Sequence, residues 1–190
     1  DNKAKAASVL VMDPKTGEVL AMANKPDFDP NEPFEGADEF TGKTEYDKVQ
    51  KMWRNRLVND TFEPGSIFKV ITAIAAMQED VVHEDDKFVC NGSLTFGNRK
   101  IKCWKTSGHG TETFPEIIQN SCNVGFMELG QRLGKDKLYK YINKFGFGKK
   151  SGIDLPGEAP GIIKNPDNIS ATDLATISFG HTNAVNSVQF

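Results

Sequence analysis

Ser66 and Lys69 are three residues apart in the segment Glu-Pro-Gly-Ser-Ile-Phe-Lys that begins at Glu63. On a helix this spacing places both side chains on one face, with Cβ atoms about 5–6 Å apart. A serine hydroxyl needs an adjacent base to become a nucleophile, and a lysine amine can be that base when burial lowers its pKa. The pair therefore predicts a nucleophilic serine and its base. A helix start also leaves the Ser66 N–H free to face a developing oxyanion.

The alternative interpretation is an ordinary solvated helix start, because Ser-x-x-Lys arises by chance about once in a chain of this length. Two details favour the interpretation as a nucleophile and its base. This is the only Ser-x-x-Lys pattern among the nine serines of the chain. Lys69 also interrupts the apolar run from Ile67 to Ile71. A buried lysine is costly, so its placement there needs a reason.

A second candidate group, Ser121-Cys122-Asn123, follows 55 residues after Ser66 and lies between two predicted helices. A serine hydroxyl there can relay a proton, and an asparagine amide offers both a donor and an acceptor to a peptide backbone. Taken alone, the same residues would be read as a helix cap.

The three cysteines, Cys90, Cys103 and Cys122, fall within one window that also contains His109. An odd count argues against a closed set of disulfides. Three thiolates and one imidazole suit tetrahedral zinc, and with all four positions filled the metal would be structural. The spacing is looser than in a zinc finger, so two alternatives stay open: a Cys90–Cys103 disulfide with a free Cys122, or three inert cysteines.

Apolar periodicity and turn residues predict the elements that must position these groups. We expect a hairpin from Ala7 to Asn24, with its turn at residues 14–17, and a second from Phe88 to Trp104 that turns at Gly97-Asn98. Residues 25–47 and 146–161 are expected to be loops. The predicted helices span residues 66–78, 115–119, 124–133, 135–145 and 171–179, the last capped by Ser170.

Composition excludes several classes of protein. The 190 residues carry a formal net charge of −3 with both signs mixed, so no basic stripe indicates a nucleic-acid partner. The longest apolar run, Val70 to Met77, is too short to span a bilayer. The chain opens with a polar stretch instead of a signal peptide, which suggests a cut inside a larger protein.

Glu-Pro-Gly-Ser-x-x-Lys followed by Ser-x-Asn resembles the first two motifs of the penicillin-recognising serine enzymes. Three further segments resemble class B penicillin-binding proteins in particular, so the resemblance covers essentially the whole chain. These are the first hairpin from Val11 to Met22, the loop from Pro26 to Asn31, and the later loop from Gly152 to Glu158.

The resemblance implies an α+β penicillin-binding/β-lactamase-like fold, in which a helical cluster packs against an antiparallel sheet. It implies a D,D-transpeptidase that cross-links peptidoglycan stem peptides on the outer face of the bacterial membrane, within a cell-wall synthesis complex, and that β-lactams acylate. Ser66 would attack, Lys69 would take the proton, Ser121 would relay a proton to the leaving D-alanine, and Asn123 would hold the substrate backbone. No organic cofactor is implied. Some elongation-type relatives carry zinc ligands at positions that match the Cys₃His set.

The family's third motif, Lys-Thr-Gly, is expected on a strand after Ser-x-Asn. Lys15-Thr16-Gly17 stands before Ser66, in the turn of the first hairpin, and is better explained as turn chemistry. After Asn123 the one tripeptide of this kind is Lys150-Ser151-Gly152, which lies in the loop expected at residues 146–161 and not on a strand. We therefore expect residues 1–190 to be the first part of the transpeptidase domain, which a second chain or C-terminal segment completes. Alone, they should neither fold well nor acylate, because a lone hairpin is marginal in water.

Two other functions fit the same motifs. A serine β-lactamase or β-lactam sensor would need a base that activates a deacylating water, and no obvious carboxylate motif provides one. A non-catalytic scaffold in a cell-wall complex would not need all four motif residues. His181 and His83 are expected to be exposed loop residues without a catalytic role.

Overall fold

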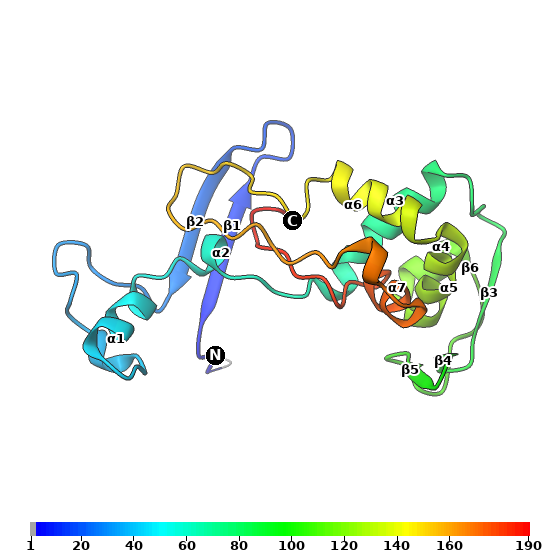
Figure 1. The fold of residues 1–190 in the computed structure, drawn as a ribbon, viewed down its shortest axis with the longest axis horizontal. Coiled ribbons are helices and arrows are strands. Elements are labelled where there is room, and N and C mark those ends of the chain that lie inside the picture. The colour runs from blue at the N-terminus through cyan, green and yellow to red at the C-terminus, as the bar shows by residue number, and fades with distance from the viewer. Residues whose placement is uncertain (1–2) are drawn as a thin grey trace. The chain divides into compact units, whose positions relative to one another are not determined.

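The computed structural model describes residues 3–190, which form two compact units (Figure 1). The first unit contains the chain up to Thr61 together with Lys150–Ala159 and Asn186–Phe190. The second contains Phe62–Lys149 and Pro160–Val185, and it holds every residue that the sequence predicts to be catalytic or metal-binding.

The first unit opens with the predicted antiparallel hairpin of β1 (Ala7–Met12) and β2 (Val19–Lys25). The turn between them contains Lys15-Thr16-Gly17, and Gly17 takes φ 76°, a conformation that glycine adopts at little cost. The turn interpretation of this Lys-Thr-Gly is therefore confirmed. Within the unit, the two-stranded sheet leaves apolar side chains in solvent, including Val9 at 57% and Leu20 at 65% exposure.

The predicted loop 25–47 is wrong at its end, because it contains η1 (Ala37–Glu39) and the start of α1 (Glu45–Met52). A further short helix, α2 (Arg56–Asn59), was also not predicted. Thr44 caps α1 by accepting a hydrogen bond from the Asp47 N–H, and the Asp47 carboxylate accepts one from the Thr44 N–H. The helix is short and mostly polar, so its apolar pattern was weak.

The loop 150–159 has no helix or strand, as predicted for residues 146–161. A carboxylate holds it closed: Glu158, which is 7% exposed, accepts hydrogen bonds from the N–H groups of Ser151 and Gly152 at 2.5 and 3.1 Å. These bonds lower the pKa of Glu158 against the opposing effect of burial, which is the largest single influence.

The second unit is a cluster of helices that pack around α5 (Asn123–Leu133). Its neighbours in Figure 1 include α3, α4, α6 and α7. Side chains of α5, such as Phe126, Met127 and Leu129, are fully buried in the core. Apart from the start of α3, the helices match the predicted ranges within about two residues, and their bounds are α3 (Lys69–Gln78), α4 (Phe114–Gln119), α6 (Lys135–Lys144) and α7 (Ala171–Ile177).

The start of the predicted helix 66–78 differs from expectation, because residues 65–68 form a separate 3-10 turn, η2 (Gly65–Phe68), before α3 begins at Lys69. Phe68 and Ile71 anchor this element in a second core cluster with Leu138, Ile142 and Ile177. The cap of α7 is confirmed: the Ser170 hydroxyl accepts from the Asp173 N–H at 3.1 Å.

The predicted hairpin 88–104 is only partly correct. Its inner part is a hairpin of β4 (Ser93–Phe96) and β5 (Arg99–Lys102), with the turn at Gly97-Asn98. The strand that ends at Cys90, β3 (Lys87–Cys90), instead pairs with β6 (Gly110–Thr113). The turn residues reveal the local hairpin, but the sequence carries no signal for the pairing between strands twenty residues apart.

Helices and antiparallel strand pairs together give the predicted α+β class. Among residues 3–190, no helix is both long and apolar enough to cross a membrane.

Candidate functional site

The junction of η2 and α3 brings the hydroxyl of Ser66 to 3.3 Å from the amine of Lys69. Ser66 lies on the exposed side of the 3-10 turn, where a substrate can reach it. Lys69 is 4% exposed, which confirms the burial that its apolar neighbours predicted.

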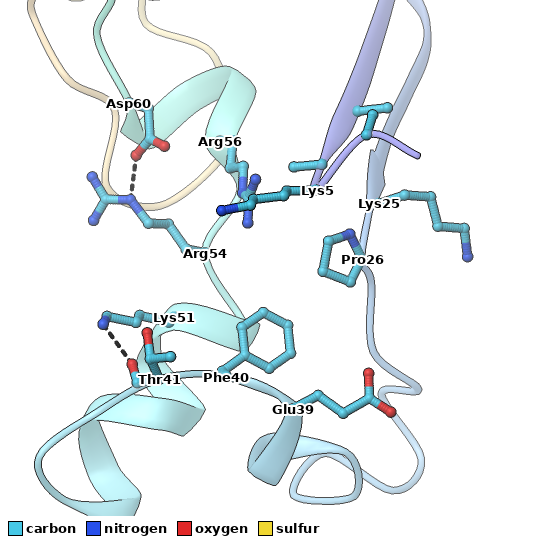
Figure 2. Close-up of a pocket in the computed structure, with 13 residues that line it drawn as sticks. Lys5, Lys25, Pro26, Glu39, Phe40, Thr41, Lys51, Arg54, Arg56 and Asp60 are labelled. Atoms are coloured by element: carbon cyan, nitrogen blue, oxygen red, sulfur yellow. Dashed lines mark hydrogen bonds and ion pairs between the residues drawn. The ribbon is translucent and has the colours of Figure 1, made fainter. Parts of the chain in front are cut away.

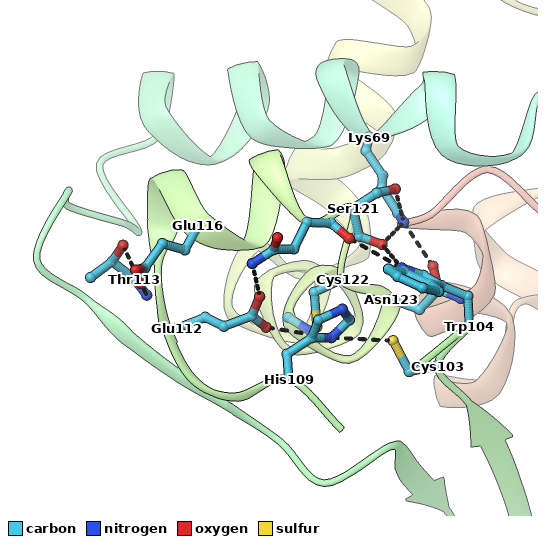
Figure 3. Close-up of polar contacts among 12 residues, drawn as sticks. Lys69, Cys103, Trp104, His109, Glu112, Thr113, Glu116, Ser121, Cys122 and Asn123 are labelled. Atoms are coloured by element: carbon cyan, nitrogen blue, oxygen red, sulfur yellow. Dashed lines mark hydrogen bonds and ion pairs between the residues drawn. The ribbon is translucent and has the colours of Figure 1, made fainter. Parts of the chain in front are cut away.

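The Lys69 amine also contacts both polar residues of the second motif (Figure 3). Its Nζ lies 2.8 Å from the Ser121 carbonyl oxygen, 2.9 Å from the Ser121 hydroxyl and 2.7 Å from Asn123 Oδ1. Together with Ser66 Oγ this makes four oxygen neighbours. An ammonium has only three hydrogens, whereas a neutral amine donates two, one to each carbonyl oxygen, and keeps its lone pair for a hydroxyl proton.

Burial lowers the pKa of Lys69 from 10.5 to about 8, although the nearby thiols Cys103 and Cys122 act to raise it. The amine is therefore neutral in a useful fraction of molecules near neutral pH, which is the condition for a general base. The lowered pKa of Lys69 therefore fits the role of base that the sequence predicts for this residue.

The backbone at Ser121 is strained in a way that places its hydroxyl. Ser121 takes φ 48°, in the left-handed region that favours glycine. It occupies the first position beyond the last turn of α4, where the Ser121 N–H donates to Ile118 O at 3.0 Å and the Cys122 N–H donates to Ile117 O at 2.9 Å. This pair of bonds is a Schellman motif, which usually ends in glycine. A serine here indicates that the hydroxyl is needed, since such strain is typical of functional sites.

The next residues join the turn to α5. Cys122 is fully buried and caps the helix, with its sulfur accepting from the Gly125 N–H at 3.4 Å. Asn123 is the first residue of α5, and its side chain faces the Lys69 amine. The structure therefore brings the four predicted residues, Ser66, Lys69, Ser121 and Asn123, into one site; their individual roles stay predictions.

The segment before Ser66 is held by the loop that follows α7, a contact that the sequence did not reveal. A Cβ at Gly180 would lie 2.0 Å from the Gly65 carbonyl oxygen, so the two backbones touch. Glu63 accepts from the Thr182 N–H at 2.7 Å and lies 2.9 Å from His181 Nδ1. His181 is an exposed loop residue, as predicted, but it has a partner.

The four predicted metal ligands, Cys90, Cys103, His109 and Cys122, also come together: their ligand atoms all lie within 4.8 Å of one another. All three cysteines are free and buried, so the alternative of a Cys90–Cys103 disulfide is wrong for this structure. The loop after Trp104 folds back onto the strand end at Cys90. Glycine permits this approach, because a Cβ at Gly92 would lie 1.9 Å from the Thr106 carbonyl oxygen.

Two polar atoms at this cluster are buried in a way that could suit metal ligation. His109 Nε2 and Glu112 Oε2 are buried without a hydrogen-bond partner, and buried polar atoms in native proteins are rarely left so. Glu112 is 3% exposed and lies 3.8 Å from His109 Nδ1, where a carboxylate can orient a ligating imidazole. Glu112 was not predicted from the sequence, although its position three residues after the candidate ligand His109 could have indicated it.

Backbone N–H groups favour the thiolate form of one of these cysteines. Burial acts to raise the pKa of Cys103, but N–H groups of Lys105, Asn123 and Val124 outweigh it and lower that pKa. Two of these groups belong to the start of α5, where the helix dipole favours a thiolate. Burial raises the pKa of Cys122 instead, so this thiol would lose its proton only to a metal.

A hollow of about 750 Å³ lies in the first unit and contains none of the predicted site residues (Figure 2). It is bordered by more cations than carboxylates, but several cations already have partners. Arg54 pairs with Asp60, and Lys51 donates to the Thr41 carbonyl. Without a nucleophile or a buried polar group directed into it, this hollow is not a candidate active site.

Comparison with known proteins agrees with the geometry. Residues 7–190 match the penicillin binding protein transpeptidase domain family. The chain is 42% identical over 181 residues to stage V sporulation protein D of Bacillus subtilis, covering 95% of this chain and 26% of that protein. It is 32% identical over 189 residues to peptidoglycan D,D-transpeptidase FtsI of Escherichia coli, covering 99% and 29%.

Solved structures show the same fold. Penicillin binding protein 3 from Mycobacterium tuberculosis, complexed with aztreonam, superposes with a TM-score of 0.81 at 31% identity, covering 98% of this chain and 39% of that one. The chain thus spans about a quarter to two fifths of the length of these proteins. With the family match across almost all of its residues, the chain belongs to the transpeptidase-domain family of the class B penicillin-binding proteins.

Proposed function

We propose that this chain forms the first part of a serine D,D-transpeptidase that cross-links peptidoglycan stem peptides and that β-lactams inhibit covalently. The observation that carries the proposal is the buried Lys69 amine, which contacts the hydroxyls of both Ser66 and Ser121. The relatives named as D,D-transpeptidases and the relative bound to aztreonam support the substrate class and the inhibitor class.

In the proposed mechanism, Ser66 Oγ attacks the carbonyl carbon of a D-alanyl-D-alanine stem peptide while its proton passes to the neutral amine of Lys69. Ser121 then passes a proton to the nitrogen of the leaving D-alanine, and the C–N bond breaks to give an acyl-serine. The amine of a neighbouring stem peptide attacks this ester, forms the cross-link and returns the proton. Asn123, which reaches the same amine at 2.7 Å, can also present its side-chain N–H to the substrate backbone.

The proposal includes a third motif of the Lys-Thr-Gly type that a further segment or a second chain supplies. Lys150-Ser151-Gly152, the one such tripeptide after Asn123, lies in a loop and not on a strand. The β1–β2 hairpin presents apolar side chains, such as Val9 and Leu20, that additional strands would cover. A strand carrying this motif would bring a second N–H to the oxyanion, beside the N–H of Ser66. Activity would therefore need the complete domain.

Labelling with a fluorescent penicillin tests the function in the full-length protein. We expect one covalent adduct on Ser66, identified by mass spectrometry of the labelled peptide, and loss of labelling by about three orders of magnitude in Ser66→Ala. The lifetime of the acyl-enzyme separates the alternatives: hours for a transpeptidase, and rapid hydrolysis for a β-lactamase. Absence of any adduct would favour a non-catalytic scaffold.

We further propose that Cys90, Cys103, His109 and Cys122 hold one structural Zn²⁺. The set provides the usual four ligands of a structural zinc site, and tetrahedral zinc needs its ligand atoms about 3.5–4 Å apart, close to the present arrangement within 4.8 Å. Four protein ligands leave no open position, so the ion would tie the strand end at Cys90 to the turn at Cys122 without entering the reaction.

Location and partners follow from the proposed substrate. Cross-linking of stem peptides takes place outside the cytoplasmic membrane, so we propose that the protein acts at the extracytoplasmic face of the bacterial membrane with other proteins of cell-wall synthesis. The similarity to a sporulation protein of Bacillus subtilis suggests spore formation as one such process.

A further inference from the structure

The end of α4 presents two backbone carbonyls that the helix itself cannot satisfy. The last carbonyls of any helix lack intrahelical partners, and here the Schellman turn accounts for those of Ile117 and Ile118. The carbonyls of Asn120 and Ser121 lie beyond that turn. Their direction is set by groups outside the helix.

The indole of Trp104 binds both of these carbonyls. Its Nε1–H is shared between Asn120 O at 3.1 Å and Ser121 O at 3.2 Å. The ring is 64% exposed, so burial contributes little to its position. The ring packs edge-on against His109, with centroids 5.2 Å apart. Because most of the ring lies in solvent, the hydrogen bonds of its N–H explain why a tryptophan stands at this position.

The Ser121 carbonyl is also a partner of the catalytic amine. It accepts from Lys69 Nζ at 2.8 Å, so one oxygen is bound by the amine on one side and by the indole on the other (Figure 3). Because Ser121 is in the strained left-handed conformation, its carbonyl and hydroxyl move together if the turn relaxes.

We propose that Trp104 is a positioning residue of the active site: its indole N–H holds the left-handed turn at Ser121, and thereby keeps the Ser121 carbonyl and hydroxyl on the Lys69 amine. This inference deepens the proposed function and rests on it. Trp104 acts through Ser121 and takes no part in proton transfer.

The test replaces the N–H while keeping an aromatic ring. In the full-length protein, Trp104→Phe removes the donor, and Trp53→Phe is the matched control. Trp53 is also a surface tryptophan whose Nε1–H binds a backbone carbonyl, that of Pro33 at 2.6 Å, but it lies outside the second unit. Stopped-flow labelling with a fluorescent penicillin separates the non-covalent dissociation constant from the acylation rate constant.

We expect Trp104→Phe to lower the acylation rate constant about ten- to hundredfold, since small displacements of catalytic groups cost this much. The dissociation constant, the melting temperature and the metal content should stay near those of the unchanged protein, and Trp53→Phe should acylate normally. An unchanged acylation rate overturns the proposal, and so does a loss that is matched by lower stability or lost metal, which would make the role structural.

A second variant covers the case in which Trp104→Phe does not fold. Incorporation of 3-benzothienylalanine at position 104 replaces the N–H by sulfur and keeps the shape of the ring, so the same slow acylation is expected. Normal acylation of this variant also overturns the proposal. If the unchanged protein forms no adduct on Ser66, the proposed function fails, whereas normal acylation by both variants removes the role of Trp104 alone.

Discussion

In the proposed mechanism, the protonation state of the Lys69 amine decides whether the single residue Ser66 can react. Burial lowers the pKa of Lys69 to about 8, so the neutral fraction is about a tenth at pH 7 and rises as the pH increases. We therefore expect the acylation rate constant to rise between pH 6 and 8 and to level off above about pH 8.5. Measurement of acylation by a β-lactam across this range checks it. Lys69→Arg, which keeps a charge but cannot release a proton, should be inactive at every pH, and a flat profile for the unchanged protein would contradict Lys69 as the base.

The strain at Ser121 gives a second residue-scale prediction. Ser121→Gly removes the left-handed strain and Ser121→Ala keeps it, while both remove the hydroxyl. We expect both variants to acylate slowly, and the glycine variant to be more stable than the alanine variant by about 1 kcal/mol. Chemical denaturation of the two proteins measures this difference. If the alanine variant proves as stable as the glycine variant, the backbone at this turn is not strained.

At the scale of elements, the Cys₃His cluster joins the end of β3, the loop before β6 and the start of α5. We expect about one zinc per chain, and we expect His109→Ala to lose it and to lower the melting temperature by about 5 °C or more. His83→Ala is the control, because His83 is a solvent-exposed histidine outside the cluster, with its Nδ1 3.9 Å from the Asp80 carboxylate. Metal analysis and thermal melts check both variants. Purified protein without zinc, and without affinity for added zinc, would rule the site out.

The same elements show what could be predicted from the sequence. The helices of the second unit have clear apolar periodicity and strong caps, such as Ser170, so their ranges were predicted closely. The four catalytic candidates were found because Ser66 and Lys69 are close in the chain and a family motif adds Ser121 and Asn123. Trp104, Glu112 and the Glu63–His181 pair were missed, since their partners are brought by strand pairing and by loops, which leave no local pattern.

Over the whole molecule, the first two motifs come together in one site, whereas Lys150-Ser151-Gly152 lies in a loop and not on the strand that we propose for the third motif. We expect residues 1–190 alone to have low stability and no measurable labelling by a fluorescent penicillin. Co-expression with a segment that carries a Lys-Thr-Gly or Lys-Ser-Gly strand should restore both. Thermal melts followed by circular dichroism and gel-based labelling check the two halves of this prediction. Efficient labelling of the isolated chain would show that these residues suffice.

The backbone contact between Gly65 and Gly180 limits how such a protein can change under antibiotic selection. Any side chain at position 180 would meet the carbonyl of the residue before the nucleophile, and Gly180 itself takes φ 90°. A substitution at position 180 would displace Ser66, and this would slow its proposed reaction with the natural substrate as well as with a drug. We therefore expect resistant forms to keep this glycine and to vary at exposed positions such as His181, where a side chain can alter access to the serine without moving it.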